Sequence, residues 1–95
     1  MKTFPIEVGS VVRSMAGRDQ GRLFIVIQEI DEDFVMIANG RLRGMDRLKK
    51  KRRRHLKAIG AVVEELRGRL AEGGKVEDHE IRSWLVKEEE KLVQV

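Results

Sequence analysis

The residues best suited to chemistry in this sequence form a run of six consecutive cations at positions 49–54, KKKRRR. Like charges this close repel one another unless a counterion or a polyanion lies against them. A phosphate backbone is a polyanion that lysine and arginine bind readily. The run therefore predicts phosphate binding. A solvated loop or a nuclear-localisation-like tract is the alternative that the run alone leaves open.

Further cations lie close to this run and extend the predicted phosphate-binding set. Residues 41–57 contain ten Lys/Arg and one acidic residue. The residues expected to contact phosphate here are Arg41, Arg43, Arg47, Lys49, Lys50, Lys51, Arg52, Arg53, Arg54 and Lys57. His55 is a candidate for stacking on a base or contacting a 2′-hydroxyl, and the alternative is a plain surface histidine. Phosphate contacts position a nucleic acid but read no sequence.

A second candidate contact lies in the stretch from Val11 to Val26, where two apolar runs flank a short polar turn. Gly17 and Gly21 bracket this turn, and glycine is the residue that readily takes positive φ. The pattern predicts a β-hairpin whose loop these two glycines shape. Arg18 and Arg22 then lie at its tip, where they either contact an anion or remain solvated.

No arrangement of residues in the sequence indicates catalysis or a metal site. The chain has no cysteine, its two histidines lie in no recognised motif, and it has no phosphate-loop or dinucleotide-binding motif. Asp31, Glu32 and Asp33 are consecutive, but they lack the spacing of a calcium loop and are typical of a turn. We therefore expect no enzymatic activity, no cofactor and no bound metal.

The composition of the 95 residues, 41% hydrophobic and 38% charged, predicts one small domain, with or without an appendage. The sequence has no apolar stretch of membrane-spanning length and no signal-peptide core at its start, so we expect a cytoplasmic protein. Residues 1–57 contain 14 Lys/Arg and 7 Asp/Glu, whereas residues 58–95 contain 6 and 9. The first part therefore suits a polyanion, and the acidic second part disfavours an anionic membrane surface.

Short apolar runs separated by turn residues predict a mainly β first part. We expect strands at residues 10–16, 23–30 and 34–38, a turn at Asn39-Gly40, a fourth strand near 42–48, a basic loop, and a fifth strand near 54–59. The continuously apolar run from Leu23 to Ile27 predicts a strand that is covered on both faces. Five short strands favour a small closed barrel, because closure removes exposed strand edges. Phe24 and Phe34 are expected in the core, which leaves few aromatic platforms for single-stranded bases.

Gly60 marks the predicted boundary, after which the apolar spacing becomes helical. Apolar residues three and four positions apart predict a helix over residues 61–70, which Gly73-Gly74 ends. A second helix is expected with Asp78 or Glu77 as its N-cap. Its apolar stripe contains Ile81, Trp84, Leu85 and Leu92. We expect the helices to form a hairpin that packs on itself, on the two-sided strand or on a protein partner.

Several of these residues together resemble a KOW motif, in which apolar and polar residues alternate around a central glycine. The resemblance is to Val11-Val12, Ala16-Gly17-Arg18-Asp19-Gln20-Gly21-Arg22-Leu23 and Val26. With Val8-Gly9, Asp31, Phe34-Val35 and His55-Leu56, the chain resembles the KOW-type large-subunit ribosomal proteins of archaea and eukaryotes and their short bacterial relatives. The resemblance implies an SH3-like barrel that contacts ribosomal or other structured RNA, with Arg18 and Arg22 on phosphate.

We therefore expect a five-stranded SH3-like barrel at residues 1–59 and a helical-hairpin extension at residues 60–95. The expected function is non-catalytic RNA binding in association with the ribosome, with no membrane contact and with the helices available to a protein partner. The alternatives are a KOW protein-interaction module of the transcription or translation machinery and a basic binder of duplex DNA.

Overall fold

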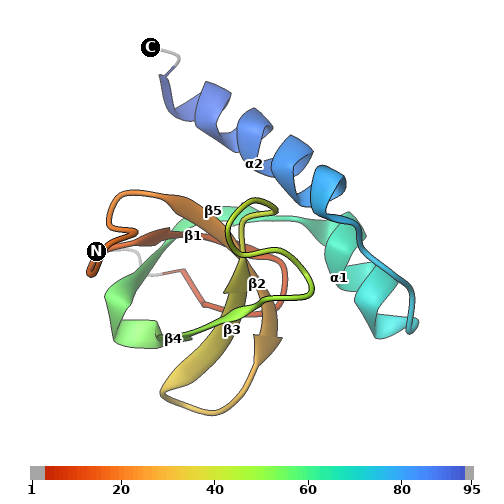
Figure 1. Cartoon of the computed structure of the whole chain (residues 1–95), viewed down its shortest axis with the longest axis horizontal. Coiled ribbons are helices and arrows are strands. Elements are labelled where there is room, and N and C mark those ends of the chain that lie inside the picture. The colour runs from red at the N-terminus through yellow and green to blue at the C-terminus, as the bar shows by residue number, and fades with distance from the viewer. Residues whose placement is uncertain (1–3, 94–95) are drawn as a thin grey trace.

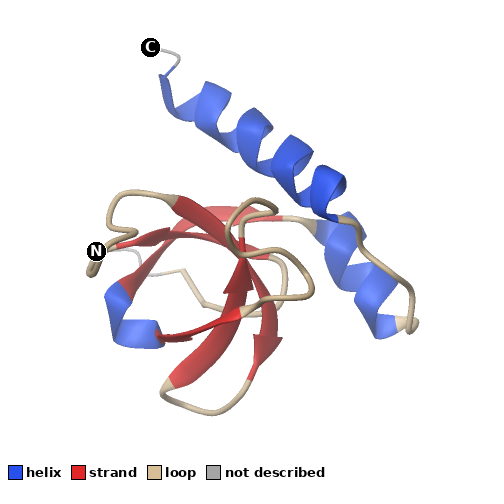
Figure 2. Ribbon diagram, viewed as in Figure 1, coloured by secondary structure: helices blue, strands red, loops and turns tan. Residues whose placement is uncertain are grey.

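The chain forms a five-stranded antiparallel sheet followed by two helices (Figures 1 and 2). The computed structural model describes residues 4–93. Residues 1–3 of the predicted barrel segment and residues 94–95 of the predicted helical segment lie outside it. The elements are β1 (Ser10–Ser14), β2 (Leu23–Glu29), β3 (Phe34–Ala38), β4 (Lys49–Arg52), the 3-10 helix η1 (Arg53–His55), β5 (Leu56–Val62), α1 (Glu64–Ala71) and α2 (Asp78–Val93). Within residues 4–93, neither α-helix has the length and apolar character needed to cross a membrane.

The sheet is strongly curled, because its two edge strands are neighbours in the sequence. The strand order is β4-β3-β2-β1-β5, yet only the three residues of η1 separate β4 from β5. Five strands spaced about 4.8 Å apart would place the edges of a flat sheet about 19 Å apart. The link from Arg52 to Leu56 spans at most about 14 Å. The edges therefore curve toward each other (Figure 2), although no backbone ladder joins them within the described chain.

The first three predicted strands are confirmed, and β2 is buried on both faces as its apolar run predicts. One core lies between the sheet and the helices and contains Val11, Leu23, Ile25, Ile27, Ala38, Leu66, Val76, Ile81 and Leu85. The other lies on the opposite face and contains Val12, Phe24, Val26, Val35, Ile37 and Leu56. Successive residues of β2 alternate between the two cores, as side chains of a strand do. The helices therefore cover one face of the sheet.

The predicted fourth strand near residues 42–48 is wrong, because these residues form a loop and the strand is formed by the first four residues of the basic run. The side chains of a strand alternate between its two faces. In β4 this places Lys49 and Lys51 on one face and Lys50 and Arg52 on the other. The first pair meets a carboxylate and the second an aromatic ring, so the repulsion between neighbouring cations is compensated.

The last strand and the first helix both begin later than predicted. β5 starts at Leu56 and continues through Gly60, so α1 begins at Glu64 and not at residue 61. Gly60 has a φ of 93°, and a Cβ atom there would lie 3.0 Å from the ring of Phe4. Its missing side chain lets the strand pass this ring, at the position where the boundary between the strands and the helices was predicted.

Glu77, one of the two predicted candidates, is the N-cap of α2. Its amide donates to Glu80 Oε1 at 3.1 Å, which is one half of a capping box. Arg69 of α1 lies 2.6 Å from the same carboxylate and ties the two helices together. Ile81 is fully buried, whereas Leu92 is 49% exposed. The predicted apolar stripe thus packs only along the first part of α2, and the rest of the helix projects past the sheet (Figure 1).

Candidate nucleic-acid interface

The loop between β1 and β2 has the shape that its two glycines allow. Gly17 and Gly21 have φ values of 86° and 89°, in a region that other residues rarely occupy. The amide of Gly21 donates to the carbonyl of Ser14 at 2.7 Å and closes the loop. Folded in this way, the loop turns Asp19 toward the protein and leaves its two arginines exposed.

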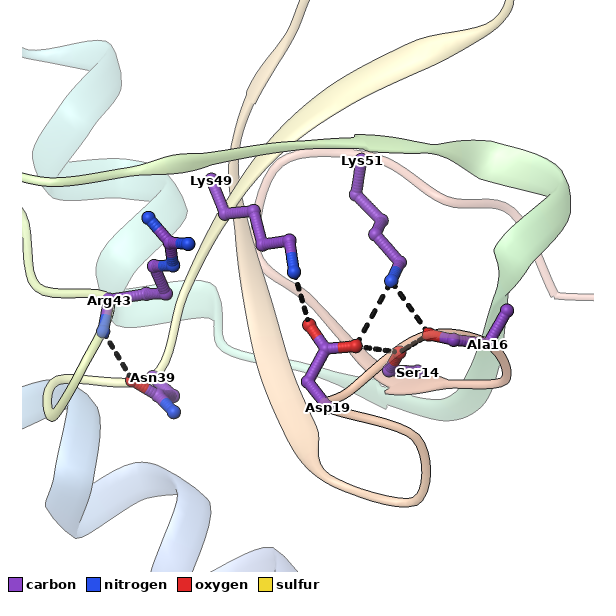
Figure 3. A network of polar contacts seen from close by, with 7 residues as sticks. All are labelled: Ser14, Ala16, Asp19, Asn39, Arg43, Lys49 and Lys51. Atoms are coloured by element: carbon purple, nitrogen blue, oxygen red, sulfur yellow. Dashed lines mark hydrogen bonds and ion pairs between the residues drawn. The ribbon is translucent and has the colours of Figure 1, made fainter.

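Asp19 is the centre of a polar network that ties this loop to β4 (Figure 3). Its carboxylate lies 2.9 Å from Lys49 Nζ and 3.0 Å from Lys51 Nζ. Ser14 Oγ donates to it at 2.7 Å, and Lys51 also donates to the carbonyl of Ala16 at 2.9 Å. Burial alone would raise the pKa of Asp19, but hydrogen bonds from the hydroxyl and the two lysines outweigh it and hold this pKa well below its ordinary value. Two cations of the basic run are thus held by one carboxylate within the protein.

Arg53, in η1, is a third cation of the run that is engaged inside the protein. Its Nη1 donates to the carbonyl of Ile6 at 2.6 Å, and its Nε donates to the carbonyl of Asp31 at 2.9 Å. Its Nη2 lies 3.0 Å from Glu29 Oε1. This guanidinium joins the lead-in segment, the β2–β3 turn and the end of β2. It therefore serves the fold directly.

Lys50 and Arg52 alternate along the chain with these three cations and point to the other face of β4. Lys50 Nζ lies 4.4 Å from the centroid of the Phe34 ring, and Arg52 Cζ lies 4.9 Å from it, within the range of cation–π contacts. The predicted core position is therefore confirmed for Phe24 and wrong for Phe34, which is half-buried. The remaining predicted contacts of this segment are Arg54 and Lys57, which are exposed, and His55, which is half-buried.

Four of the predicted cations meet around one cleft of about 340 Å³, between the β1–β2 loop and the loop that follows β3. The cleft is lined by Arg18, Asp19, Arg22, Phe24, Asn39, Leu42, Arg43 and Lys49. The one carboxylate in the lining, that of Asp19, already forms ion pairs with two lysines. Within residues 4–93, none of its three arginines forms an ion pair. The cleft therefore carries a net positive charge.

A second groove, of about 320 Å³, lies between the same loops and α2. It is lined by Gly21, Arg22, Leu23, Asn39, Arg41, Arg82, Leu85, Val86 and Glu89. Arg22 and Asn39 line both hollows and so separate them. The fold thus brings Arg41 close to the cleft, while Arg47 is exposed further along its loop.

The loop of residues 39–48 is shaped at its start by one side chain. Asn39 Oδ1 accepts hydrogen bonds from the backbone amides of Arg41 at 3.0 Å and Arg43 at 3.1 Å. An asparagine that caps its own turn in this way is a common device. It fixes the backbone from which both arginines project.

The same loop is also held by the N-terminal part of α2. Asp78 Oδ1 accepts a 2.7 Å hydrogen bond from the amide of Met45, and the Arg82 guanidinium donates to the carbonyl of Gly40. A Cβ atom on Gly40 would lie only 2.6 Å from the carbonyl oxygen of Asp78. The helix therefore sets the position of one wall of the cleft.

Sequence reasoning missed three residues of this site: Asp19, Asn39 and Leu42. The signal for Asn39 was present, because the Asn39-Gly40 pair was recognised as a turn and asparagine often caps its own turn. Asp19 gave no local signal, since its lysine partners are 30 and 32 residues away. The exposure of Leu42 depends on a loop that was predicted to be a strand.

Chemically, the arrangement is able to hold anionic oxygen atoms through charge-assisted hydrogen bonds from arginine. In the part of the chain that the structure describes, no three His, Cys, Asp or Glu residues come together as metal ligands. No model of a known protein family matches the sequence, and a search of curated proteins finds no significant similarity.

Proposed function

We propose that this protein binds structured RNA, ribosomal RNA in particular, through backbone phosphates and without catalysis. In this proposal the curled sheet is an SH3-like barrel of the KOW type, the helices are its hairpin extension, and the protein acts in the cytoplasm with the ribosome. The main support is the cationic cleft, where Arg18, Arg22 and Arg43 have no acidic partner among residues 4–93.

The distribution of the other cations supports an extended polyanion over a small anion. Arg41 lies beside the cleft, and Lys50 and Arg52 are exposed on the outer face of β4. A small anion would occupy one of these places only, whereas a folded RNA presents phosphates on many sides. Lys49, which lines the cleft, and Lys51 are both held by Asp19, so this pair gives the cleft a fixed edge and does not need to contact the ligand.

A triple variant tests this proposal without disturbing the internal ion pairs. We expect Arg18→Gln/Arg22→Gln/Arg43→Gln to weaken binding to a folded ribosomal RNA fragment, measured by fluorescence anisotropy between about 50 and 200 mM salt. If all three arginines contact phosphate, the slope of log affinity against log salt should fall by about 2 to 3. The variant should unfold at the same urea concentration as the wild type, because these side chains make no hydrogen bond within the described residues.

The matched control is Lys75→Gln/Lys87→Gln/Lys91→Gln, which removes the same charge from the helical part. It should leave the salt slope nearly unchanged. Equal affinity and slope for the wild type and the cleft variant would rule the proposal out. Tighter binding to a duplex DNA of the same length would favour the DNA-binding alternative, and absence of RNA binding at low salt would favour a protein-interaction module.

A further inference from the structure

We propose that the cleft between the β1–β2 loop and residues 39–43 takes a single unpaired nucleotide of the RNA, with its phosphate on the arginines and its base between Leu42 and Asn39. This inference rests on the proposed RNA binding and goes beyond it. The phosphate contacts proposed above would hold any folded RNA, whereas this cleft would select one local feature, a base that is not paired.

The first support is a side-chain donor, on a largely buried residue, that the protein itself does not use. Asn39 is only 8% exposed, and its Oδ1 accepts from two backbone amides, those of Arg41 and Arg43. Because only an oxygen accepts from two N–H groups, the oxygen and nitrogen of this amide are unambiguously assigned. Nδ2 makes no hydrogen bond to residues 4–93, and yet no buried polar side-chain atom there lacks a partner.

Nδ2 therefore reaches the surface, and Asn39 is a residue that lines both hollows. Figure 3 shows it directed away from the backbone amide that the oxygen binds. Both lone pairs of Oδ1 are used, so Asn39 presents donors only. It would bind an acceptor atom, which base edges and phosphates both provide.

The second support is the charge balance of the cleft. Lys49 and Lys51 already neutralise Asp19, so Arg18, Arg22 and Arg43 give the cleft its net charge. The volume of about 340 Å³ is at the small end of the range of ligand sites, which is about 300 to 1,000 Å³. One nucleotide, and not a helix of paired RNA, matches a hollow of this size.

The third support is an apolar wall, which a site for phosphate alone would not need. Leu42, which is 73% exposed, lines the cleft together with Phe24, which belongs to the core. Exposed leucine is costly in water, and the flat face of an unpaired base would cover it. Unpaired bases of RNA are typically bound by stacking on side chains combined with hydrogen bonds to their edges. Leu42 and Asn39 together offer both kinds of contact.

The test compares two RNA hairpins that differ by one bulged uridine in the stem. We expect the full chain to bind the bulged hairpin about tenfold more tightly, the combined effect of one hydrogen bond and one apolar contact. Leu42→Ala should lower this preference about fivefold, because the exposed side chain contributes the apolar contact. The control Lys50→Gln should weaken both complexes equally. In a ¹⁵N-labelled protein, the side-chain amide signals of Asn39 should shift with the bulged hairpin and not with the paired one.

The outcomes separate this inference from the proposed function. Equal affinity for the two hairpins, with unmoved Asn39 signals, overturns the nucleotide site and leaves phosphate-based RNA binding intact. A preference that survives Leu42→Ala, again with unmoved Asn39 signals, places the selectivity elsewhere and also overturns the inference. Failure to bind either hairpin overturns both proposals.

Discussion

At the scale of single residues, Asp19 determines which cations of the basic run are available to a ligand. It contacts Lys49 and Lys51, the two lysines on the inner face of β4, and Ser14 donates to the same carboxylate. The lysines are therefore fixed in place, while Lys50 and Arg52 remain on the outside. A single acidic residue thus converts an apparently uniform cationic run into an internal and an external set.

We expect Asp19→Asn to lower the free energy of unfolding by about 2 kcal/mol at pH 7, because both lysines lose a largely buried counter-charge. The pKa of Asp19 is lowered in the folded protein, so its stabilisation is present above the unfolded pKa of about 3.8 and is lost as the pH falls below it. Urea unfolding followed by circular dichroism should show a smaller difference between variant and wild type at pH 3 than at pH 7.

Asp33→Asn is the matched control for this prediction. Asp33 is exposed and its side chain makes no hydrogen bond or ion pair with residues 4–93. We expect its replacement to leave stability unchanged at both pH values. A difference between Asp19→Asn and wild type that stays constant from pH 7 to pH 3 would contradict the assigned role of the carboxylate.

At the scale of elements, the loop of residues 39–48 depends on its contact with α2. Gly40 has a φ of 74°, and a Cβ atom there would lie 2.6 Å from a backbone oxygen of the helix. We expect Gly40→Ala to destabilise the protein by about 2 kcal/mol, from strain and from displacement of the loop. Thermal unfolding should show a melting temperature lower by about 8 °C or more.

Gly68→Ala is a glycine replacement that should change the stability in the opposite direction. Gly68 lies within α1, and a Cβ atom there would meet nothing within 4 Å. Alanine is a better helix former than glycine by about 1 kcal/mol, so this variant should be more stable than the wild type. A Gly40→Ala variant that melts at or above the temperature of the wild type would show that the helix does not constrain the loop at Gly40.

The elements that the sequence predicted correctly are those with local causes. The β1–β2 hairpin and the two-sided β2 follow from periodicity and turn chemistry within a few residues, whereas Glu77 was one of two candidates for the N-cap of α2. β4 could not be found in this way, because the carboxylate that compensates its lysines lies 30 residues earlier. The same applies to the cleft: Arg18 and Arg22 were predicted, but their meeting with Asn39 and Leu42 depends on how two distant loops approach each other.

At the scale of the whole molecule, charge and packing divide the chain differently. Residues 1–57 carry a net charge of +7 and residues 58–95 a net charge of −3. The first helix and the beginning of the second nevertheless supply Leu66, Ile81 and Leu85 to the core that covers β2. The acidic segment is therefore part of the fold of the basic one. Its charge would direct an RNA toward the loops and away from the end of α2.

This shared core predicts that the helices and the sheet unfold together. Trp84, the single tryptophan, is half-buried on α2 and packs against this core, so its fluorescence reports on helix docking. Far-ultraviolet circular dichroism reports on all elements. We expect the two signals to change at the same urea concentration, as they do in a two-state transition.

Ile81→Ala should move both midpoints down together, by the equivalent of about 2 to 5 kcal/mol, because Ile81 is fully buried. Leu92→Ala, on the projecting part of α2, should leave both nearly unchanged. A fluorescence transition that precedes the circular dichroism transition would mean that α2 detaches while the sheet stays folded, and that the acidic segment is an appendage after all.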